Sequence, residues 1–441
     1  TLVARELPVA WVRDEAVNTT LKPLLVGNRK AWRPFWLLQA PHRLAFFAAA
    51  LMLMVSSVWW MLMLGMRYLG YQPQMVIPMS SAHGLLMSGG FMPMFFAGFL
   101  FTAGPKWLDV AGVHAKRLLP ALGLMLMGWL TTLLGFHTNH LVASCGMVLV
   151  ALGWGWLCKM FIRLILSSRC DDRLHTKLAA VACSVGAATF GLAALALATQ
   201  APTALRLVTQ AAIWWFLTPV FAVVSHRMLP IFGTNAVPFP DTWRPMGLLW
   251  VMLATLGFEG LFAIAETGWW PLSAGMRWIQ VAIETPASLL MIWLTARWGL
   301  VQSLKIRLLA MLHAGFVWLG LALVLNAISH LLMALSDDHL SLGLAPLHAL
   351  TMGYLGATMF AMTTRVSSGH GGRPVAADNP AWVLYWFLQV AVALRVTAAL
   401  WPLAGTPMSL LAISAWAIAT IGWSIRYGRW FGQPRADGRP G

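Results

Sequence analysis

The stretch HGLLMSGGFMPMFFAGFLFTAGPKW, residues His83 to Trp107, decides how the rest of the chain is interpreted. It is apolar enough to cross a lipid bilayer, yet it begins with a histidine. A histidine that enters a membrane helix is costly unless it faces protein, water or a ligand. The stretch also contains five glycines, which let neighbouring backbones approach closely, and Pro93, which interrupts the helical hydrogen bonds in mid-span. We therefore interpret it as one wall of a buried site rather than as a simple anchor.

The composition is that of an integral membrane protein. Of the 441 residues, 59% are hydrophobic and only 10% are charged, whereas a soluble protein is about 25% charged. No long segment has a soluble composition, so we expect one membrane domain (44–425) embedded in the lipid bilayer, with tails at 1–43 and 426–441. The net charge of +16 comes from basic residues at the ends of apolar segments. These residues are typical of topology determinants, which argues against nucleic-acid binding.

Twelve apolar segments have the length of about 20 residues that a bilayer core requires. The sequence therefore predicts an all-α membrane protein, a twelve-helix transmembrane bundle. The predicted spans are 44–66, 82–104, 118–136, 141–160, 178–199, 205–225, 246–265, 278–296, 308–335, 342–364, 381–402 and 407–425.

The basic residues test this count of spans. If the N-terminus is cytoplasmic, the cytoplasmic segments hold 26 of the 30 lysines and arginines, and the opposite loops hold three. An excess of Lys and Arg marks the cytoplasmic side of a membrane protein. A wrong number of spans would place many of these basic residues on the opposite side of the membrane. Twelve spans keep them on one side, so we predict that both termini are cytoplasmic.

Several histidines lie a turn or more inside the predicted spans, notably His83, His313, His330 and His348. Imidazole ligates transition metals and haem iron, and histidines on separate helices can bind one metal within a bundle. The alternative for any one of them is a hydrogen bond to a backbone carbonyl. Taken together, they predict at least one metal or haem site.

Charged residues within or beside the spans are further candidates. Glu259 and Glu284 lie in predicted spans, where a carboxylate usually belongs to a proton or ion path. The alternative is a protonated side chain that bonds a neighbouring helix. Arg227 and Arg365 border the apolar region, and a guanidinium can clamp carboxylates such as haem propionates. The alternative for both arginines is a purely topological role.

Four blocks of the sequence resemble the NnrS family, membrane proteins of the bacterial nitric oxide response. The blocks extend over most of the chain, and the last is the most specific. They are Trp32-Arg33-Pro34-Phe35-Trp36; His83 with Gly98-Phe99-Leu100-Phe101-Thr102-Ala103 and Lys106-Trp107; Arg227 with Pro230 and Phe232; and His348-Ala349-Leu350-Thr351-Met352-Gly353 with Arg365, Gly369-His370 and Gly372-Arg373-Pro374.

The resemblance implies haem, expected to be b-type, and copper as cofactors, nitric oxide as the ligand or substrate, and a multi-pass location in the bacterial inner membrane. One motif departs from the family pattern. The family often shows His-x-His-Glu at the start of the second helix, whereas this chain has Ser81 and Gly84 at the first and last of those positions. If that pair holds a second metal in the family, this chain would lack it.

These observations lead to one hypothesis about the site. His83 and His348 are predicted as buried ligands in the outer half of the membrane. His226 and His313 are candidates for a second, inner site with Arg227 and Arg365 on haem propionates, and His370 is a further candidate contact. Glu259 or Glu284 would pass protons if the protein reduces nitric oxide.

The function itself leaves three classes open. The protein can be an oxidoreductase resembling a nitric oxide reductase. It can also be a sensor or assembly factor that binds haem without turnover. The third class is a transporter of a metal, haem or a nitrogen-containing small molecule, because twelve helices and a Pro-broken span also occur in transporters.

Overall fold

The chain folds into a bundle of long helices. The computed structural model describes residues 31–236 and 243–439, and no strand occurs within these ranges. Most of the predicted N-terminal tail, residues 1–30, lies outside the described part. The helices are η1 (Pro34–Gln39), α1 (Pro41–Tyr68), α2 (Met79–Gly89), α3 (Met92–Trp107), η2 (Ala115–Arg117), α4 (Leu119–Thr138), α5 (His140–Ser167), α6 (Leu174–Ala198), α7 (Pro202–Ala211), η3 (Ala212–Leu217), α8 (Thr218–Ala236), α9 (Met246–Gly268), α10 (Ala274–Arg297), α11 (Leu300–Ser303), α12 (Arg307–Leu335), α13 (Ala345–His348), η4 (Ala349–Gly356), α14 (Ala357–His370), α15 (Asn379–Leu400), η5 (Pro402–Ala404) and α16 (Gly405–Phe431).

The predicted spans correspond to helices throughout. In the described part of the chain, 11 helical runs are long and apolar enough to cross a membrane, and each coincides with a predicted span. The remaining predicted span, 342–364, corresponds to a continuous helical run through α13, η4 and α14. The prediction of an all-α membrane bundle is therefore confirmed.

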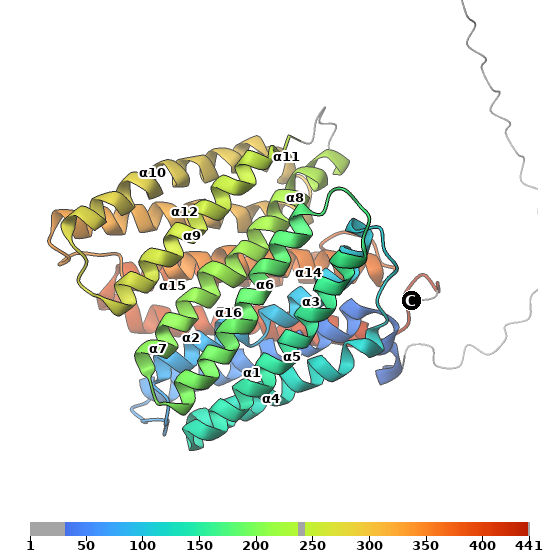
Figure 1. Ribbon diagram of the computed structural model, residues 1–441, viewed down its shortest axis with the longest axis horizontal. Helices are drawn as coiled ribbons and strands as arrows, with labels where there is room; N and C mark the ends of the chain where they lie inside the picture. Colours follow the sequence, from blue (N-terminus) through green and yellow to red (C-terminus); the bar gives the residue numbers. More distant parts are fainter. Residues whose placement is uncertain (1–30, 237–242, 440–441) are drawn as a thin grey trace, which may run out of the picture.

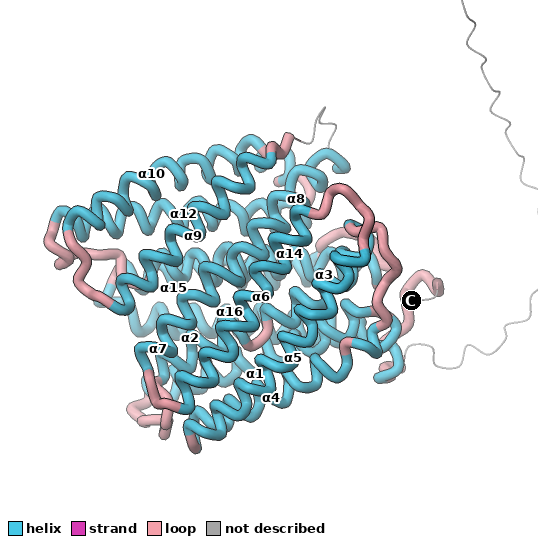
Figure 2. Tube along the Cα trace, viewed as in Figure 1, coloured by secondary structure: helices cyan, strands magenta, loops and turns pink. Residues whose placement is uncertain are grey.

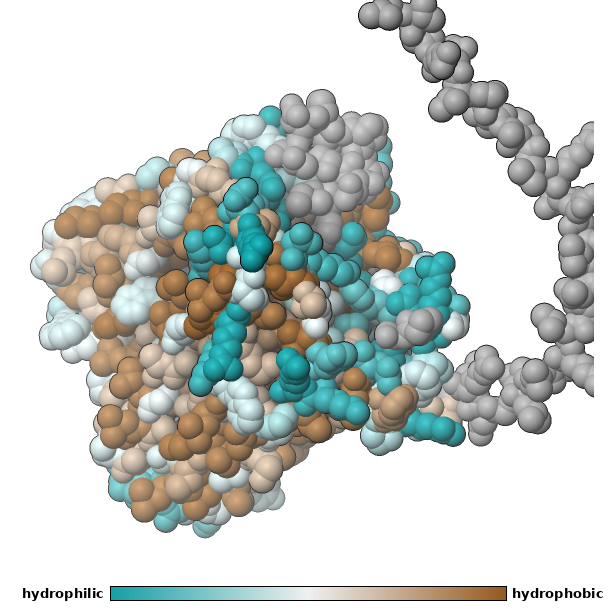
Figure 3. Space-filling model, turned by 45° about the vertical axis from the view of Figure 1, so that its right-hand side comes forward, coloured by the Kyte–Doolittle hydropathy of each residue, from teal (hydrophilic) through white to brown (hydrophobic). Residues whose placement is uncertain are grey.

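Loops gather at the two ends of the bundle (Figure 2), and the two described chain ends meet at one of them (Figure 1). There the backbone N–H of Arg33 donates to the carbonyl of Gly432 over 2.8 Å, and Arg43 donates to the carbonyl of Gln433. Hydrophilic side chains gather towards this end, while hydrophobic side chains cover much of the flank (Figure 3). We call it the inner end, following the predicted topology, and the opposite end, which holds Phe136 and Arg277, the outer end.

The second span is broken in the middle, as Pro93 led us to expect. α2 ends at Gly89, and α3 begins at Met92 with Pro93 in its first turn. At that position proline costs no hydrogen bond, because the first N–H groups of a helix have no partner within it. A Cβ on Gly90 would lie 2.5 Å from the carbonyl oxygen of Leu86, so the break requires glycine. The break also separates the segment that carries His83 from the Phe-rich α3.

Two other spans contain wide helical turns. Residues 212–217 in the sixth span and 349–356 in the tenth are π-helical. Such turns are rare and are frequent at functional sites. The second of them directly follows His348.

Candidate functional site

The predicted ligands His83 and His348 both lie at the outer end of the bundle. The His83 ring stacks on Trp60 of α1, with 3.8 Å between ring centroids, and its Nδ1 is buried without a hydrogen-bond partner. Nδ1 of His348 lies 2.9 Å from the carbonyl oxygen of Leu344. That nitrogen must therefore carry the proton, which leaves a lone pair on Nε2. His348 and Arg395 are close enough to act electrostatically on His83. The structure thus brings the two predicted ligands into one region, and each keeps a ring nitrogen that can ligate.

The two positions that depart from the family pattern lie beside His83 on α2. Ser81 is buried. A Cβ on Gly84 would lie 3.4 Å from the Thr209 methyl group, so this side of α2 faces α7 closely.

The inner candidate His226 bonds to a second imidazole, His175, which the sequence analysis did not select. His226 Nδ1 lies 3.1 Å from His175 Nε2, and His226 Nε2 lies 3.2 Å from the carbonyl oxygen of Pro245. A carbonyl only accepts, so His226 is protonated on Nε2 and accepts from His175 on Nδ1. The lone pair of His175 then faces Arg227 over 3.5 Å. The two histidines are 51 residues apart in sequence, and no local pattern connects them.

His313 follows the alternative that the sequence analysis left open. Its Nδ1 lies 3.1 Å from the carbonyl oxygen of Leu309, and its Nε2 lies 3.0 Å from that of Trp298. His226 lies on another side of the same tryptophan, with 6.1 Å between the ring centroids. Both nitrogens of His313 therefore face backbone carbonyls rather than His226.

Arg227 lies in a region of excess positive charge. It forms an ion pair with Asp172 over 3.2 Å and lies 4.7 Å from the centre of the Trp107 ring. Burial and the neighbouring Arg227 cation lower the pKa of Arg244, which lies in the loop before α9. One nitrogen of Arg244 is buried without a hydrogen-bond partner. Two guanidiniums and one carboxylate thus act on each other electrostatically here, and this excess of positive charge suits an additional anionic group.

His370 and Arg365 both belong to α14. The His370 ring lies tilted at 45° to the His42 ring with 4.8 Å between ring centroids, and Nδ1 of His42 is buried without a hydrogen-bond partner. Lys106 acts electrostatically on both histidines. Arg365 is half-buried one turn before His370. The structure does not join His370 to the His226 cluster through any hydrogen bond of the described residues.

Glu259 and Glu284 come together in the outer half of the bundle. Both oxygens of Glu284 lie 2.8 Å from Nδ1 of His330. Glu259 accepts a hydrogen bond from the Asn326 amide over 2.9 Å, and its other oxygen is buried without a partner. The two carboxyl groups are close enough to interact electrostatically. The sequence analysis noted His330 as embedded but had no signal that it bonds Glu284.

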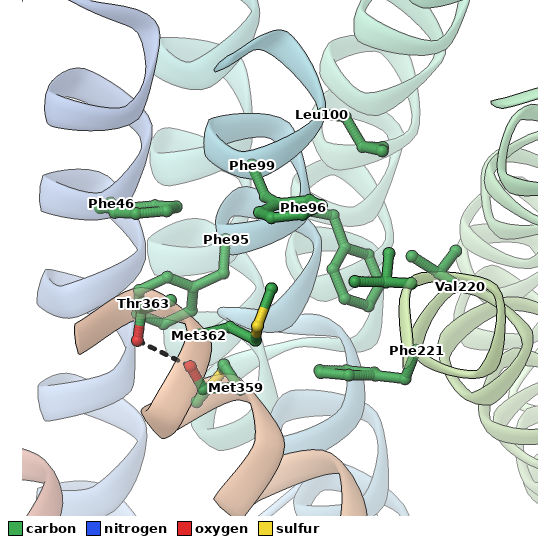
Figure 4. Close-up of a pocket in the computed structure, with 11 residues that line it drawn as sticks. Phe46, Phe95, Phe96, Phe99, Leu100, Val220, Phe221, Met359, Met362 and Thr363 are labelled. Carbon is green, nitrogen blue, oxygen red and sulfur yellow. Dashed lines mark hydrogen bonds between the residues drawn. The ribbon is translucent and has the colours of Figure 1, made fainter. Parts of the chain in front are cut away.

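An apolar cavity of about 40 Å³ lies between α1, α3, α8 and α14 (Figure 4). Aromatic and aliphatic side chains line it, together with Met359 and Met362. A cavity needs about 10–15 Å³ to hold one water-sized guest, so this one has room for a few atoms. It is large enough for a diatomic molecule and far below the 300–1,000 Å³ of sites for larger ligands.

The structure thus offers several pairs of imidazoles. Within residues 31–236 and 243–439, no three His, Cys, Asp or Glu side chains converge as they would around one metal ion. A search of curated proteins finds no match. A family model described as NnrS protein matches residues 36–435, nearly the whole chain. The chain therefore belongs to the NnrS family.

Proposed function

We propose that this protein binds haem within the membrane through His83 and His348 and, through that haem, binds nitric oxide. Membership of the NnrS family supports a membrane protein of the nitric oxide response. The observation that carries the proposal is the half-buried imidazole of His83, whose Nδ1 is buried without a hydrogen-bond partner and which lies close to His348. A buried polar atom without a partner is costly unless a ligand satisfies it.

The outer end of the bundle supplies the kind of ligand atoms that haem iron binds, the imidazole nitrogens of His83 and His348. Haem iron accepts one or two imidazole ligands and would supply the metal centre for nitric oxide, which needs a coordination position that one of the two imidazoles leaves open or gives up. His83 comes from α2 and His348 from α13, so the two would approach from different helices. Arg395 lies close enough to act electrostatically on both histidines and could pair with an anionic group of the cofactor.

The inner end supports a second, weaker candidate site. His226 with Arg227 and Arg244 would hold a cofactor that carries carboxylates, with Arg365 and His370 as nearby candidates on α14. His313 would have to give up a backbone hydrogen bond to take part. The outer pair needs no such rearrangement, so we assign the haem there first.

The apolar cavity suits nitric oxide itself. The molecule is small and uncharged, so it dissolves in the bilayer and can occupy a cavity of about 40 Å³. Thioethers such as those of Met359 and Met362 also suit Cu(I). No charged ligand lines this cavity, so we assign it to the gas and leave copper to metal analysis.

If the protein reduces nitric oxide, two molecules take up two electrons and two protons to give nitrous oxide and water. The candidate proton carriers are Glu259 and Glu284, which are both buried and interact electrostatically. Reduction needs an electron donor, so turnover is tested with an added reductant. Binding without turnover would make the protein a sensor or carrier of nitric oxide.

Alanine at His83 or His348 is expected to remove haem. Losing an axial ligand should lower the haem content of the purified protein at least about tenfold, since even partners one step beyond the ligands change metal affinity 10–100-fold. Reduced-minus-oxidised spectra with iron and copper analysis measure this loss. The control is His339→Ala, which removes an exposed imidazole at the same end.

A shift of the wild-type haem spectrum on addition of nitric oxide would support the proposal. Consumption of nitric oxide with a reductant would then make the protein an enzyme. Full haem in both alanine variants would refute the ligand assignment. A wild-type protein without iron would refute haem binding and favour the transporter, which uptake into proteoliposomes would detect.

A further inference from the structure

We infer that Glu266, His330 and Glu284 form a proton relay from the outer end of the bundle to its buried carboxylates. This inference deepens the proposed function, because it names where protons would enter the protein. It rests on the proposed function only in one respect, namely that the protons would be consumed in the reduction of nitric oxide.

The His330 imidazole bridges two carboxylates through its two ring nitrogens. Its Nδ1 lies 2.8 Å from both oxygens of Glu284, and its Nε2 lies 3.2 Å from Oε1 of Glu266. Glu266 belongs to α9, His330 to α12 and Glu284 to α10. These helices lie side by side in the upper part of Figure 1, where α10 contacts both α9 and α12. The bridge therefore exists only because three spans meet.

Exposure decreases along the bridge. The side chain of Glu266 is 24% exposed, that of His330 is 9% exposed and that of Glu284 is fully buried. Glu266 is the only one of the three with substantial access to the outer end. The imidazole contacts both carboxylates, so it offers a direct path by which a proton that arrives at Glu266 can reach Glu284.

The outer side of the relay is held in position by other side chains. Arg277 pairs with Glu266 and, over 2.9 Å, with Asp338. Gln280 donates to Glu266 over 3.0 Å and accepts from Arg277 over the same distance. These contacts keep Glu266 within reach of His330 and leave its access to the outer end open.

The inner side of the relay leads to Glu259. Its amide partner Asn326 lies one turn before His330 on α12. Glu284 and, beyond it, His330 and Glu266 act electrostatically on Glu259. The charged and titratable groups that face the imidazole are therefore Glu266, Glu284 and Glu259, with Arg277 behind Glu266. The oxygen of Glu259 that has no partner is the next proton acceptor along the path.

The geometry favours proton transfer over metal binding. A bound ion needs several ligands that converge on one point, whereas the two carboxylates bond opposite nitrogens of the ring. Imidazole moves a proton in such a position: an O–H bond of Glu266 breaks as N–H forms at Nε2, and N–H at Nδ1 breaks as O–H forms at Glu284. One proton enters and one leaves, and the ring remains neutral before and after. A ring flip, or return of the proton, restores the first tautomer.

The test measures how fast the buried carboxylates take up protons. The purified protein in nanodiscs, without nitric oxide, is subjected to a rapid pH drop while the C=O band of protonated carboxylic acids is followed by infrared spectroscopy. We expect His330→Gln to slow the rise of this band roughly 10²-fold, the lower range of what a positioned acid–base group contributes. Glu266→Gln, which keeps its hydrogen bonds but cannot carry a proton, should slow the rise similarly.

Glu284→Gln should remove a major part of the band. The control is His137→Gln, which replaces an outer-end imidazole that accepts from the Trp59 indole over 2.9 Å. Wild-type rates in both His330→Gln and Glu266→Gln would overturn the relay, as would an unchanged band in Glu284→Gln. Because haem and nitric oxide take no part in this measurement, the relay and the proposed function fail separately.

Discussion

Replacement of Arg277 by methionine is expected to destabilise the protein by about 3 kcal/mol, the cost of removing one partner of a buried ion pair. The Arg277 side chain is 1% exposed and bridges α10 to Glu266 on α9 and to Asp338 after α12. Its guanidinium also lies 5.0 Å from the centre of the Trp270 ring. Methionine keeps most of the volume but leaves two carboxylates without their cation. Both keep some exposure, so we expect the lower part of the usual 3–5 kcal/mol.

Thermal stability in detergent, followed as the temperature at which half of the monomer peak in size exclusion is lost, measures this effect. Arg67→Met is the control, since Arg67 is exposed at the same end of the bundle. Asp338→Asn added to Arg277→Met should restore part of the loss, because it removes one of the unpaired carboxylates. Equal stability of Arg277→Met and Arg67→Met would contradict the assignment of Arg277 as a buried anchor.

Replacement of Gly146 by valine is expected to separate α4 from α5 and to cost about 3 kcal/mol, the upper range for overpacking. A Cβ at this position would lie 2.5 Å from both the carbonyl oxygen of Gly128 and the backbone nitrogen of Thr132. Backbone atoms cannot turn aside as a flexible side chain can, so one helix must move. Close approach through small residues is how membrane helices associate.

The matched control is Gly155→Val on the same helix, where a Cβ would meet nothing within 4 Å. Both variants carry the same small gain in helix propensity, because valine is less unfavourable than glycine in a helix, so their difference reports packing alone. Folded yield and thermal stability of the two proteins measure it. A Gly146→Val protein as stable as Gly155→Val would show that α4 and α5 can repack without cost.

Neither of these two predictions can be made from the sequence alone. Neither the environment of Gly146 nor that of Gly155 is visible in the sequence, where both are glycines in one apolar span. In the sequence, Arg277 is one of the three basic residues of the loops opposite the predicted cytoplasmic side. Its two partners, 11 and 61 residues away, become neighbours only when three spans pack together.

The sequence by itself determined the class of fold, the positions of the spans and the family. Hydropathy and the lengths of apolar segments are local properties, and a bilayer acts on each segment separately. Pro93 likewise predicted the break in the second span, because a proline lacks the backbone N–H and disturbs the helix within one turn of its own position. The four blocks that resemble the family are also local runs of sequence, so they can be recognised without a structure.

Only the tertiary structure decided which polar side chains meet. Sequence analysis paired His226 with His313, yet His226 bonds to His175 while His313 bonds to two carbonyls. It noted Glu259, Glu284 and His330 separately, but it did not connect them and did not select Glu266, the carboxylate that faces the outer end. Side-chain partners depend on the order and rotation of helices in the bundle, and hydrophobic periodicity contains little of that information when nearly every face of every span is apolar.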